Sequence, residues 1–284
     1  MERVKSVESW YFYEEMARRQ EYGEVVTPDG KISLMPELEA EAKFFISQLR
    51  GSDFVIDVGS GLGFPSLVLA PHVKRLVALD ASPTMVSRLH SHIHKLGYNL
   101  RMSVILADAT ALPFGNEQFD GAALSGTLGS LSEPEDFLKE LHRVMREGGT
   151  VVCIAQNFRH KLQLEESGFL RFCMDNGKLT LRVTEYLSGP YRIRESCYAI
   201  CDDSKIYQIL LTEHPECSTW QAPCTLDLSD LPSDTIMEAI CNETIQYDVN
   251  GLSDALERAG FQEWCMELRP LFGLQHIFAV FEKK

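Results

Sequence analysis

The chain has 284 residues, with 27 Lys and Arg against 41 Asp and Glu, so its formal net charge is −14. This acidic balance disfavours a nucleic-acid partner, because phosphate backbones are bound by basic surfaces. No run reaches the ~20 apolar residues of a membrane-spanning helix, the N-terminal residues lack the apolar core of a signal peptide, and we expect a cytoplasmic globular protein.

Eight cysteines occur without a single Cys-x-x-Cys pair. This usage is typical of reduced thiols in a cytosolic protein and gives no support for a structural metal site. Five cysteines nevertheless fall in one middle segment, namely Cys173, Cys197, Cys201, Cys217 and Cys224. That clustering leaves open a chemical role for thiols in this part of the chain.

In chain order, an aromatic helical stretch at 7–20 precedes a second helix from Pro36 to Leu49, where apolar residues recur at helical spacing. Short apolar strands then alternate with helices. The strands are predicted at 53–58, 75–80, 102–107, 119–124 and 150–155, and the helices just after Pro65, at 83–96 and from Pro134 to Gly148. This alternation predicts an α/β fold with a doubly wound, mostly parallel sheet.

The alternation stops near residue 158. Charged helical sequence at 161–176 is followed by alternating stretches at 179–186, 191–199 and 205–211, which predict antiparallel strands. The α/β pattern returns with a helix at 252–260 and strands at 261–268 and 275–281. We therefore expect an N-terminal helical cap at 1–50, a core made of 51–157 and 246–284, and an inserted α+β substrate-binding or lid segment at 158–245.

The most informative stretch is Asp57-Val-Gly59-Ser-Gly61-Leu-Gly63, which lies between the first core strand and Pro65. A glycine turn between a strand and a helix lets a ligand approach bare backbone and a helix N-terminus. In the dinucleotide fingerprint the third glycine or alanine follows the second glycine by three residues. Here that position is Phe64. The spacing therefore argues against a nicotinamide or flavin cofactor.

Polar residues follow the next three strands, namely Asp80 after the second, Asp108 after the third and Ser125 after the fourth. Together with the glycine turn, this pattern resembles the class I S-adenosylmethionine-dependent methyltransferases. The resemblance covers roughly 50–157 and 246–284. It implies a seven-stranded Rossmann-like sheet and S-adenosyl-L-methionine as the cofactor. The residues that match the cofactor positions of this family are Asp57, Gly59, Gly61, Gly63, Asp80, Ala81, Met85, Asp108, Ala109 and Ser125.

The resemblance also implies a role for each group. Asp80 would accept hydrogen bonds from the two ribose hydroxyls, which suits its two carboxylate oxygens. Met85 would pack on the adenine, Asp108 would accept from the adenine amino group, and the backbone of Ala109 would face the ring. Asp57 would hold the glycine loop and the amino end of the methionine, and the end of the fourth strand would face the methionine portion. A carboxylate at a strand end can instead cap the following helix.

The motifs do not identify the methyl acceptor or a catalytic residue, because the cofactor carries the activation and the protein mainly aligns the reactants. The acidic charge, and Leu124–Ser130 in place of an Asn-Pro-Pro-Tyr signature, favour a small-molecule acceptor over nucleic acid. In related enzymes an N-terminal helix and an insertion after strand five close over the cofactor. Tyr11, Tyr22 and His160 are therefore candidate substrate contacts.

Two alternatives stay open. The cysteines of the insertion could serve a soft acceptor, a thiol or arsenite, or the chain could bind the cofactor without transferring a methyl group. Histidines on the helix at 83–96 offer little support for a general base. His90, His92 and His94 lie off its apolar stripe, so we expect them to face solvent.

Overall fold

The structure is a computed structural model. It describes residues 25–131, 134–156, 168–175, 178–186, 193–199, 249–271 and 274–284, with the backbone alone described for the three ranges between 168 and 199. The chain divides into two compact units. The first comprises Met1–Gln156, Tyr247–Arg269 and His276–Lys284, and the second comprises Asn157–Gln246 and Pro270–Gln275.

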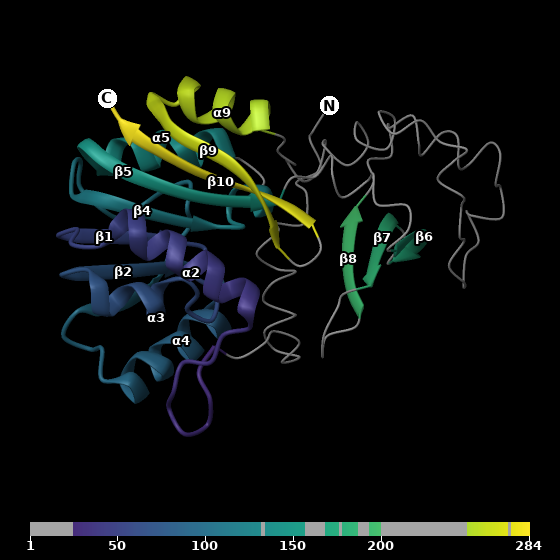
Figure 1. Ribbon diagram of the computed structural model, residues 1–284, viewed down its shortest axis with the longest axis horizontal. Coiled ribbons are helices and arrows are strands. Elements are labelled where there is room, and N and C mark those ends of the chain that lie inside the picture. The colour runs from purple at the N-terminus through teal and green to yellow at the C-terminus, as the bar shows by residue number, and fades with distance from the viewer. Residues whose placement is uncertain are drawn as a thin grey trace. The chain divides into compact units, whose positions relative to one another are not determined.

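A seven-stranded sheet in the order β3-β2-β1-β4-β5-β10-β9 forms the centre of the first unit (Figure 1). Its strands are β1 (Phe54–Val58), β2 (Arg75–Asp80), β3 (Met102–Leu106), β4 (Phe119–Ser125), β5 (Met145–Gln156), β9 (Phe261–Leu271) and β10 (Leu274–Lys283). The first five strands pair in parallel, and β10 runs antiparallel to β5. The predicted doubly wound, mostly parallel α/β sheet is confirmed.

Helices cover both faces of this sheet. They are α2 (Pro36–Leu49), which precedes β1, the connecting helices α3 (Ser66–Leu69), α4 (Pro83–Leu96) and α5 (Pro134–Val144), and α9 (Val249–Arg258), which precedes β9. From β1 the chain moves outward through β2 to β3, and then returns to β4 on the other side of β1. Because such crossovers are right-handed, α3 and α4 cover one face and α5 covers the opposite face. The strand order reverses between β1 and β4, where open α/β sheets bind ligands.

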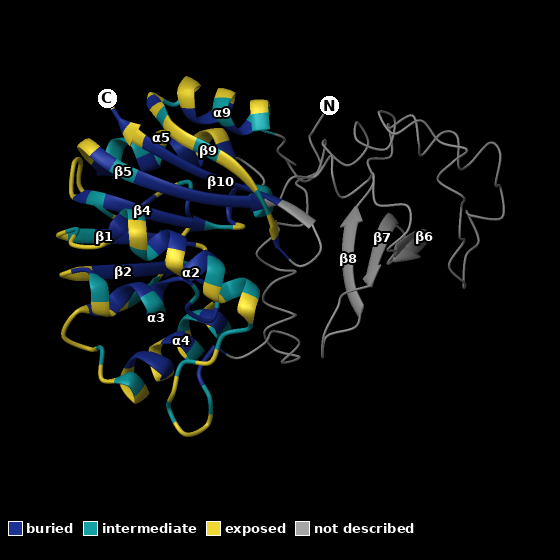
Figure 2. Ribbon diagram, viewed as in Figure 1, coloured by how far each residue is buried: buried dark blue, intermediate teal, exposed yellow. Residues whose placement is uncertain are grey.

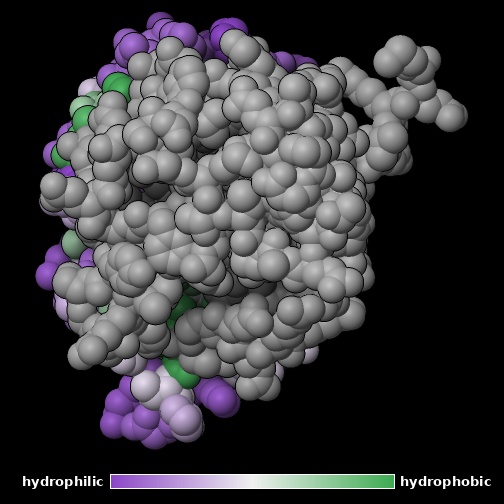
Figure 3. Space-filling view, turned by 90° about the vertical axis from the view of Figure 1, so that its right-hand side faces the viewer, coloured by the Kyte–Doolittle hydropathy of each residue, from purple (hydrophilic) through white to green (hydrophobic). Residues whose placement is uncertain are grey.

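Burial follows this layering. The four middle strands β1, β4, β5 and β10 are dark blue over most of their length in Figure 2, whereas the edge strand β9 is largely exposed. Strands covered on both faces read as nearly continuous apolar runs, which is why the sequence predicted them. The largest fully buried side chains include Phe45 from α2, Phe119 from β4 and Phe278 from β10. Where described residues are visible in Figure 3, only small hydrophobic areas are present.

Two helices have the bounds that the sequence predicted. Both α2 and α4 carry proline in the first turn. The Ser82 side chain caps α4 by accepting the backbone N–H of Met85 at 3.1 Å, and Gly97 ends the helix with φ of 70°. Within the described residues, no helix is long and apolar enough to cross a bilayer.

Two helix predictions were wrong in length. The helix that begins at Pro134 ends at Val144, not at Gly148, because Met145 already pairs with Phe119 as the first residue of β5. The helix after Pro65 is the single turn α3, and the chain then continues as a 3-10 turn, η1 (Ala70–His72).

The second unit contains a three-stranded antiparallel sheet made of β6 (Gly168–Asp175), β7 (Lys178–Tyr186) and β8 (Ile193–Ala199). The strand predicted at 179–186 is confirmed, and the strand predicted at 191–199 is confirmed for residues 193–199. The predicted helical sequence at 161–176 was wrong for residues 168–175, since this segment pairs along its length with β7. The strand predicted at 205–211 lies outside the described residues.

Candidate cofactor site

The structure brings the ten predicted cofactor residues to the carboxyl ends of β1 to β4 and to the turns and the first turn of helix that follow them. Asp57 on β1 pairs with Ala123 on the parallel strand β4. Two residues further along each segment, this register puts Ser125 beside Gly59. On β2 and β3, the N–H of Ala107, next to Asp108, donates to the carbonyl oxygen of Asp80 at 3.1 Å. The predicted groups thus line one edge of the sheet. Their roles toward a ligand stay predictions.

Backbone hydrogen bonds tie the glycine turn to the end of β2. The N–H groups of Gly59 and Ser60 donate to the carbonyl oxygen of Leu79 at 2.8 and 3.0 Å. The N–H of Gly61 donates to Asp80 Oδ2 at 2.8 Å, and the N–H of Ser82 donates to Asp80 Oδ1 at 2.9 Å. Asp80 therefore holds local backbone. Since each carboxylate oxygen carries two lone pairs, these bonds do not prevent it from also binding a ligand hydroxyl.

Two glycines of the turn, Gly63 and Gly61, have different surroundings. Gly63 has φ of 110°, and a Cβ there would lie 2.6 Å from the side chains of Leu67 and Leu89. Gly61 has φ of 51°, and no atom of the described residues lies within 4 Å of its would-be Cβ. Both need glycine for a positive φ. Of these two glycines, only Gly61 has space for a ligand beside its backbone among the described residues.

Asp57 is buried beneath the turn, with 1% of its surface exposed. The Ser66 hydroxyl donates to its Oδ2 at 2.5 Å, whereas Asp57 Oδ1 and Ser60 Oγ have no hydrogen-bond partner among the described residues. Burial raises the pKa of Asp57 to about 7, against the lowering effect of Ser66, and the negative charge of Asp80 raises it further. Buried polar atoms are nearly always hydrogen-bonded. This site therefore suits a ligand that brings donors or a positive charge.

Two apolar residues beside the turn pack inward. The Phe64 ring lies edge-on to Phe45 of α2, with 6.5 Å between centroids. This contact explains the large residue at the position where a dinucleotide-binding turn has a small one. Met85 is buried and packs with Leu62 of the glycine turn. The predicted contact between Met85 and an adenine stays a prediction.

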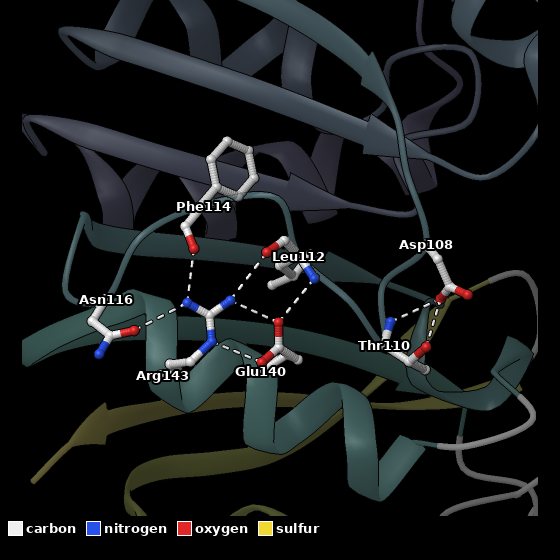
Figure 4. Close-up of polar contacts among 7 residues, drawn as sticks. All are labelled: Asp108, Thr110, Leu112, Phe114, Asn116, Glu140 and Arg143. Atoms are coloured by element: carbon white, nitrogen blue, oxygen red, sulfur yellow. Dashed lines mark hydrogen bonds and ion pairs between the residues drawn. The ribbon is translucent and has the colours of Figure 1, made fainter.

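At the end of β3, Asp108 is exposed and Ala109 is buried. Figure 4 shows the Asp108 carboxylate turned back on its own loop, where Oδ1 accepts the Thr110 N–H at 2.8 Å and the Thr110 hydroxyl at 2.9 Å. The N–H of Ala111 closes this turn by donating to the carbonyl oxygen of Asp108 at 3.2 Å. The carboxylate is thus held in position at the strand end.

At the end of β4, two side chains that the sequence analysis did not single out join the site. The Ser125 hydroxyl donates to Oε2 of Glu41 at 3.2 Å, and Glu41, on α2, is only 4% exposed. The Thr127 hydroxyl donates to the carbonyl oxygen of Val58 at 2.6 Å and fills the space beside Gly59. Because the Ser125 hydroxyl donates its hydrogen bond to Glu41, its oxygen can only accept a hydrogen bond from a ligand.

The sequence contains a signal that could have identified Glu41 as a buried acid. It falls on the apolar stripe of α2, three residues after Leu38 and four before Phe45, where an acid is out of place. Thr127 follows a strand end and carries no comparable signal.

One histidine prediction was wrong. His92 is buried, and its Nδ1 lies 3.2 Å from the carbonyl oxygen of Leu62 in the glycine turn. A carbonyl only accepts, so Nδ1 carries the proton in this contact. The buried face of α4 includes Met85, Leu89 and His92, which share one side of the helix at spacings of four and three. His90 and His94 are exposed as expected, with ring centroids 4.5 Å apart.

The predicted substrate contacts Tyr11, Tyr22 and His160 lie outside the described residues. The side chains of the clustered cysteines are outside them as well. Cys153 and Cys265 are free thiols, and burial raises the pKa of Cys153 to about 12. In the part of the chain that the structure describes, no group of three or more His, Cys, Asp or Glu could hold a metal ion.

Comparison with known families identifies the region that holds this site. Residues 56–153 match the family model described as a methyltransferase domain. Over 98 residues the chain is 36% identical to a demethylmenaquinone methyltransferase of Clavibacter sepedonicus, a match that covers 34% of this chain and 39% of that protein. For three relatives above 30% identity, the chain spans 29% to 39% of the relative's length.

Solved structures are similar over nearly the whole chain. The [4+2]-cyclase SpnF has a TM-score of 0.58 at 14% identity and covers 97% of this chain and 96% of its own. A 1,6-didemethyltoxoflavin-N1-methyltransferase of Burkholderia thailandensis, solved with 1,6-didemethyltoxoflavin and S-adenosylhomocysteine, has a TM-score of 0.54 at 13% identity, with 100% and 93% covered. Such low identities show the fold alone. The core of this chain therefore has the class I methyltransferase fold, and its residues 56–153 match a methyltransferase domain model, in agreement with the motifs.

Proposed function

We propose that this chain is an S-adenosyl-L-methionine-dependent methyltransferase that acts on a small-molecule acceptor. The observation that carries the proposal lies beneath the glycine turn, where Asp57 Oδ1 and Ser60 Oγ are buried without a hydrogen-bond partner among the described residues. An ammonium group bound there would satisfy the carboxylate oxygen and favour its ionised form. The methionine end of the cofactor supplies such a group.

The order of acids along the sheet edge supports the same ligand. Asp57, Asp80 and Asp108 lie on or just after three neighbouring strands. Parallel strands are about 4.8 Å apart, so three strand ends span roughly 10 Å, the scale of an adenosine. Carboxylates only accept hydrogen bonds, and the ammonium, the ribose hydroxyls and the adenine amino group are all donors. The residues present therefore fit this cofactor along its whole length.

When bound, the cofactor supplies a sulfonium-activated methyl group for an in-line displacement. The chain's own residues have the tasks of binding, alignment and exclusion of water. Asp57 and Ser125 would hold the methionine end, with the hydroxyl of Ser125 fixed by its bond to Glu41. We expect the Glu41–Ser125 pair to border the acceptor side of the site.

Three observations favour a small acceptor. The net charge of −14 opposes binding of a phosphate backbone. The segment after β4 reads Ser125-Gly-Thr-Leu-Gly-Ser130 and lacks an Asn-Pro-Pro-Tyr signature. The similar proteins named above include a demethylmenaquinone methyltransferase and an N1-methyltransferase of didemethyltoxoflavin. We propose that the acceptor is bound by residues outside the core, with Tyr11, Tyr22 and His160 as the first candidates, and that product analysis will identify the acceptor atom.

Cofactor binding is tested by thermal unfolding of the full chain with S-adenosylhomocysteine and, separately, with NAD. At a hundredfold excess over Kd, a ligand that binds only the folded state adds about 2.7 kcal/mol, so S-adenosylhomocysteine should raise Tm and NAD should not. Asp80→Ala should abolish the rise. Asp53→Ala, at an exposed acid paired with Lys74 just before β1, should leave it unchanged. A rise with NAD alone would overturn the proposal.

Methyl transfer is tested separately with a cofactor labelled in the methyl group. The label should appear in a fraction of small metabolites and stay absent from added RNA and protein. A second set of assays offers dithiothreitol and arsenite, which report transfer to soft acceptors. Binding of S-adenosylhomocysteine without any transfer across this panel would refute the enzymatic part and leave a cofactor-binding module.

A further inference from the structure

An ion pair on α5 binds the β3–β4 loop, which we define as residues 107–118. Glu140 and Arg143 are three residues apart, and Figure 4 shows both side chains extending from α5 toward this loop. Arg143 Nε donates to Glu140 Oε1 and Arg143 Nη2 to Glu140 Oε2, each at 2.7 Å. This two-point contact fixes the plane of the guanidinium group.

The remaining donors of Arg143 all point at the loop. Nη1 donates to the carbonyl oxygen of Phe114 at 2.7 Å and to Asn116 Oδ1 at 3.1 Å, and Nη2 donates to the carbonyl oxygen of Leu112 at 3.0 Å. Glu140 Oε2 also accepts the N–H of Leu112 at 2.9 Å. All five N–H groups of an arginine side chain are therefore used, and both backbone groups of Leu112 are held by the pair.

These contacts connect α5 to Asp108 through a short path of backbone. Leu112 follows Ala111, whose N–H bonds to the carbonyl oxygen of Asp108 at 3.2 Å. Ala109 and Leu112 are both buried, which leaves little freedom between them. The far end of the loop is held differently, since the N–H groups at positions 117 and 118 bond to backbone carbonyls at 143 and 144. Loss of the side-chain pair would therefore release residues 112–116.

A second pair on the same helix shows that the spacing alone does not create this arrangement. Lys139 and Asp136 are also three residues apart and form an ion pair of 2.6 Å, but their side chains are 71% and 54% exposed. For Arg143 and Glu140 the exposed fractions are 32% and 24%. An exposed pair of this kind contributes little to stability. It is a matched control for the pair that holds the loop.

We propose that Glu140 and Arg143 are positioning residues that set the place of Asp108 and Ala109, and thereby the preference of the site for an adenine base. This inference rests on the proposed function, because it assumes an adenosyl cofactor whose amino group faces Asp108. Arg143→Lys keeps the positive charge but loses the planar fork that binds the carboxylate and the loop carbonyls together.

The test uses isothermal titration calorimetry to compare S-adenosylhomocysteine with its purine analogue, in which a hydrogen atom replaces the amino group. The wild-type chain should prefer the adenine form, because the purine analogue has no donor for the Asp108 carboxylate at this position. Arg143→Lys should lower this preference about tenfold, the effect of about one net hydrogen bond. Lys139→Met should keep the wild-type preference. Glu140→Gln, with nearly the same shape, is the second variant and should also lower the preference.

The ratio of the two ligand affinities distinguishes a positioning role from a purely structural one. If the pair only stabilised the fold, its loss would lower Tm, but the molecules that remain folded would keep the wild-type ratio. A folded Arg143→Lys or Glu140→Gln variant with the wild-type ratio overturns the inference, as does a wild-type chain that binds both ligands equally. A wild-type chain that binds neither overturns the proposed function itself, so the two failures are distinguishable.

Discussion

Replacement of Asp57 by asparagine should change how the stability of the protein depends on pH. The Asp57 carboxyl is buried, and its pKa rises from 3.8 to about 7 on folding, chiefly because burial disfavours the charged form. A shift of this size corresponds to about 4 kcal/mol. Asparagine has nearly the same shape and does not titrate, so the variant isolates this one ionisation.

The direction of the pH dependence follows from the pKa of Asp57 in the folded and in the unfolded state. Between pH 3.8 and about 7 the folded state holds a proton at Asp57 that the unfolded state has lost. The free energy of unfolding must then fall as the pH rises through this window, and no further loss occurs above about pH 7. From pH 5.5 to 8.5 the remaining loss is about 2 kcal/mol in the wild-type chain.

The assay is urea unfolding of both chains at pH 5.5 and 8.5. The wild type should lose about 2 kcal/mol more than Asp57→Asn over this interval. Asp53→Asn is the control, because the ion pair with Lys74 lowers the pKa of Asp53. Its titration lies below the interval, so this variant should keep the wild-type dependence. Equal pH dependence in the wild type and Asp57→Asn would refute the assigned burial of an ionisable carboxyl.

Titration calorimetry with S-adenosylhomocysteine at pH 5.5 and 7.5 applies the same reasoning to the proposed function. An ammonium group next to Asp57 favours the charged carboxylate and lowers its pKa. The affinity of the wild type should therefore rise from pH 5.5 to 7.5, and the affinity of Asp57→Asn should stay nearly constant. A flat wild-type affinity would mean that the ligand binds without contacting this group.

The other substitutions separate folding from binding at neighbouring positions. Gly63→Ala should destabilise the protein by about 2–5 kcal/mol, because the strain of a positive φ adds to the contact of the methyl group with two leucine side chains. Gly61→Ala should cost about 1–2 kcal/mol of backbone strain alone, yet it should weaken binding of S-adenosylhomocysteine in titration calorimetry. Equal effects of the two variants on stability and on binding would contradict this division. Thr127→Val removes the bond to the Val58 carbonyl and should lower the free energy of urea unfolding by about 1 kcal/mol. Glu41→Gln retains an acceptor for Ser125, so Tm should change little while kcat/KM falls about tenfold with the lost charge; unchanged turnover would exclude Glu41 from the site.

Much of the core could be predicted because its signals are local. The central strands are buried on both faces and read as apolar runs, and α4 carries its own start at Ser82 and its own stop at Gly97. The glycine spacing and the acids at strand ends are also local patterns. These patterns suffice to predict that the cofactor groups lie at one edge of the sheet.

The failures depend on partners that are distant in sequence. In β6 the residues at 169, 170, 172 and 174 are all apolar, so neither a strand nor a helix period stands out, and pairing with β7 decides the outcome. The apolar residues Val86, Leu89 and Ile93 recur at helical spacing and predict a buried stripe that excludes His92. The stripe instead runs through Met85, and the carbonyl oxygen of Leu62 provides the polar partner that lets a histidine be buried there.

The pair that binds the β3–β4 loop shows most clearly where sequence patterns stop being informative. Asp136–Lys139 and Glu140–Arg143 are two acid–base pairs with the same spacing on one helix, and periodicity treats them alike. Only the second has backbone carbonyls within reach, because the loop after β3 returns across this turn of α5. Arginine can use such carbonyls and a carboxylate at once, which lysine cannot do with the same geometry. In the proposed role, Glu140 and Arg143 act through the loop that the fold places opposite them, and the ratio of the two ligand affinities tests this placement.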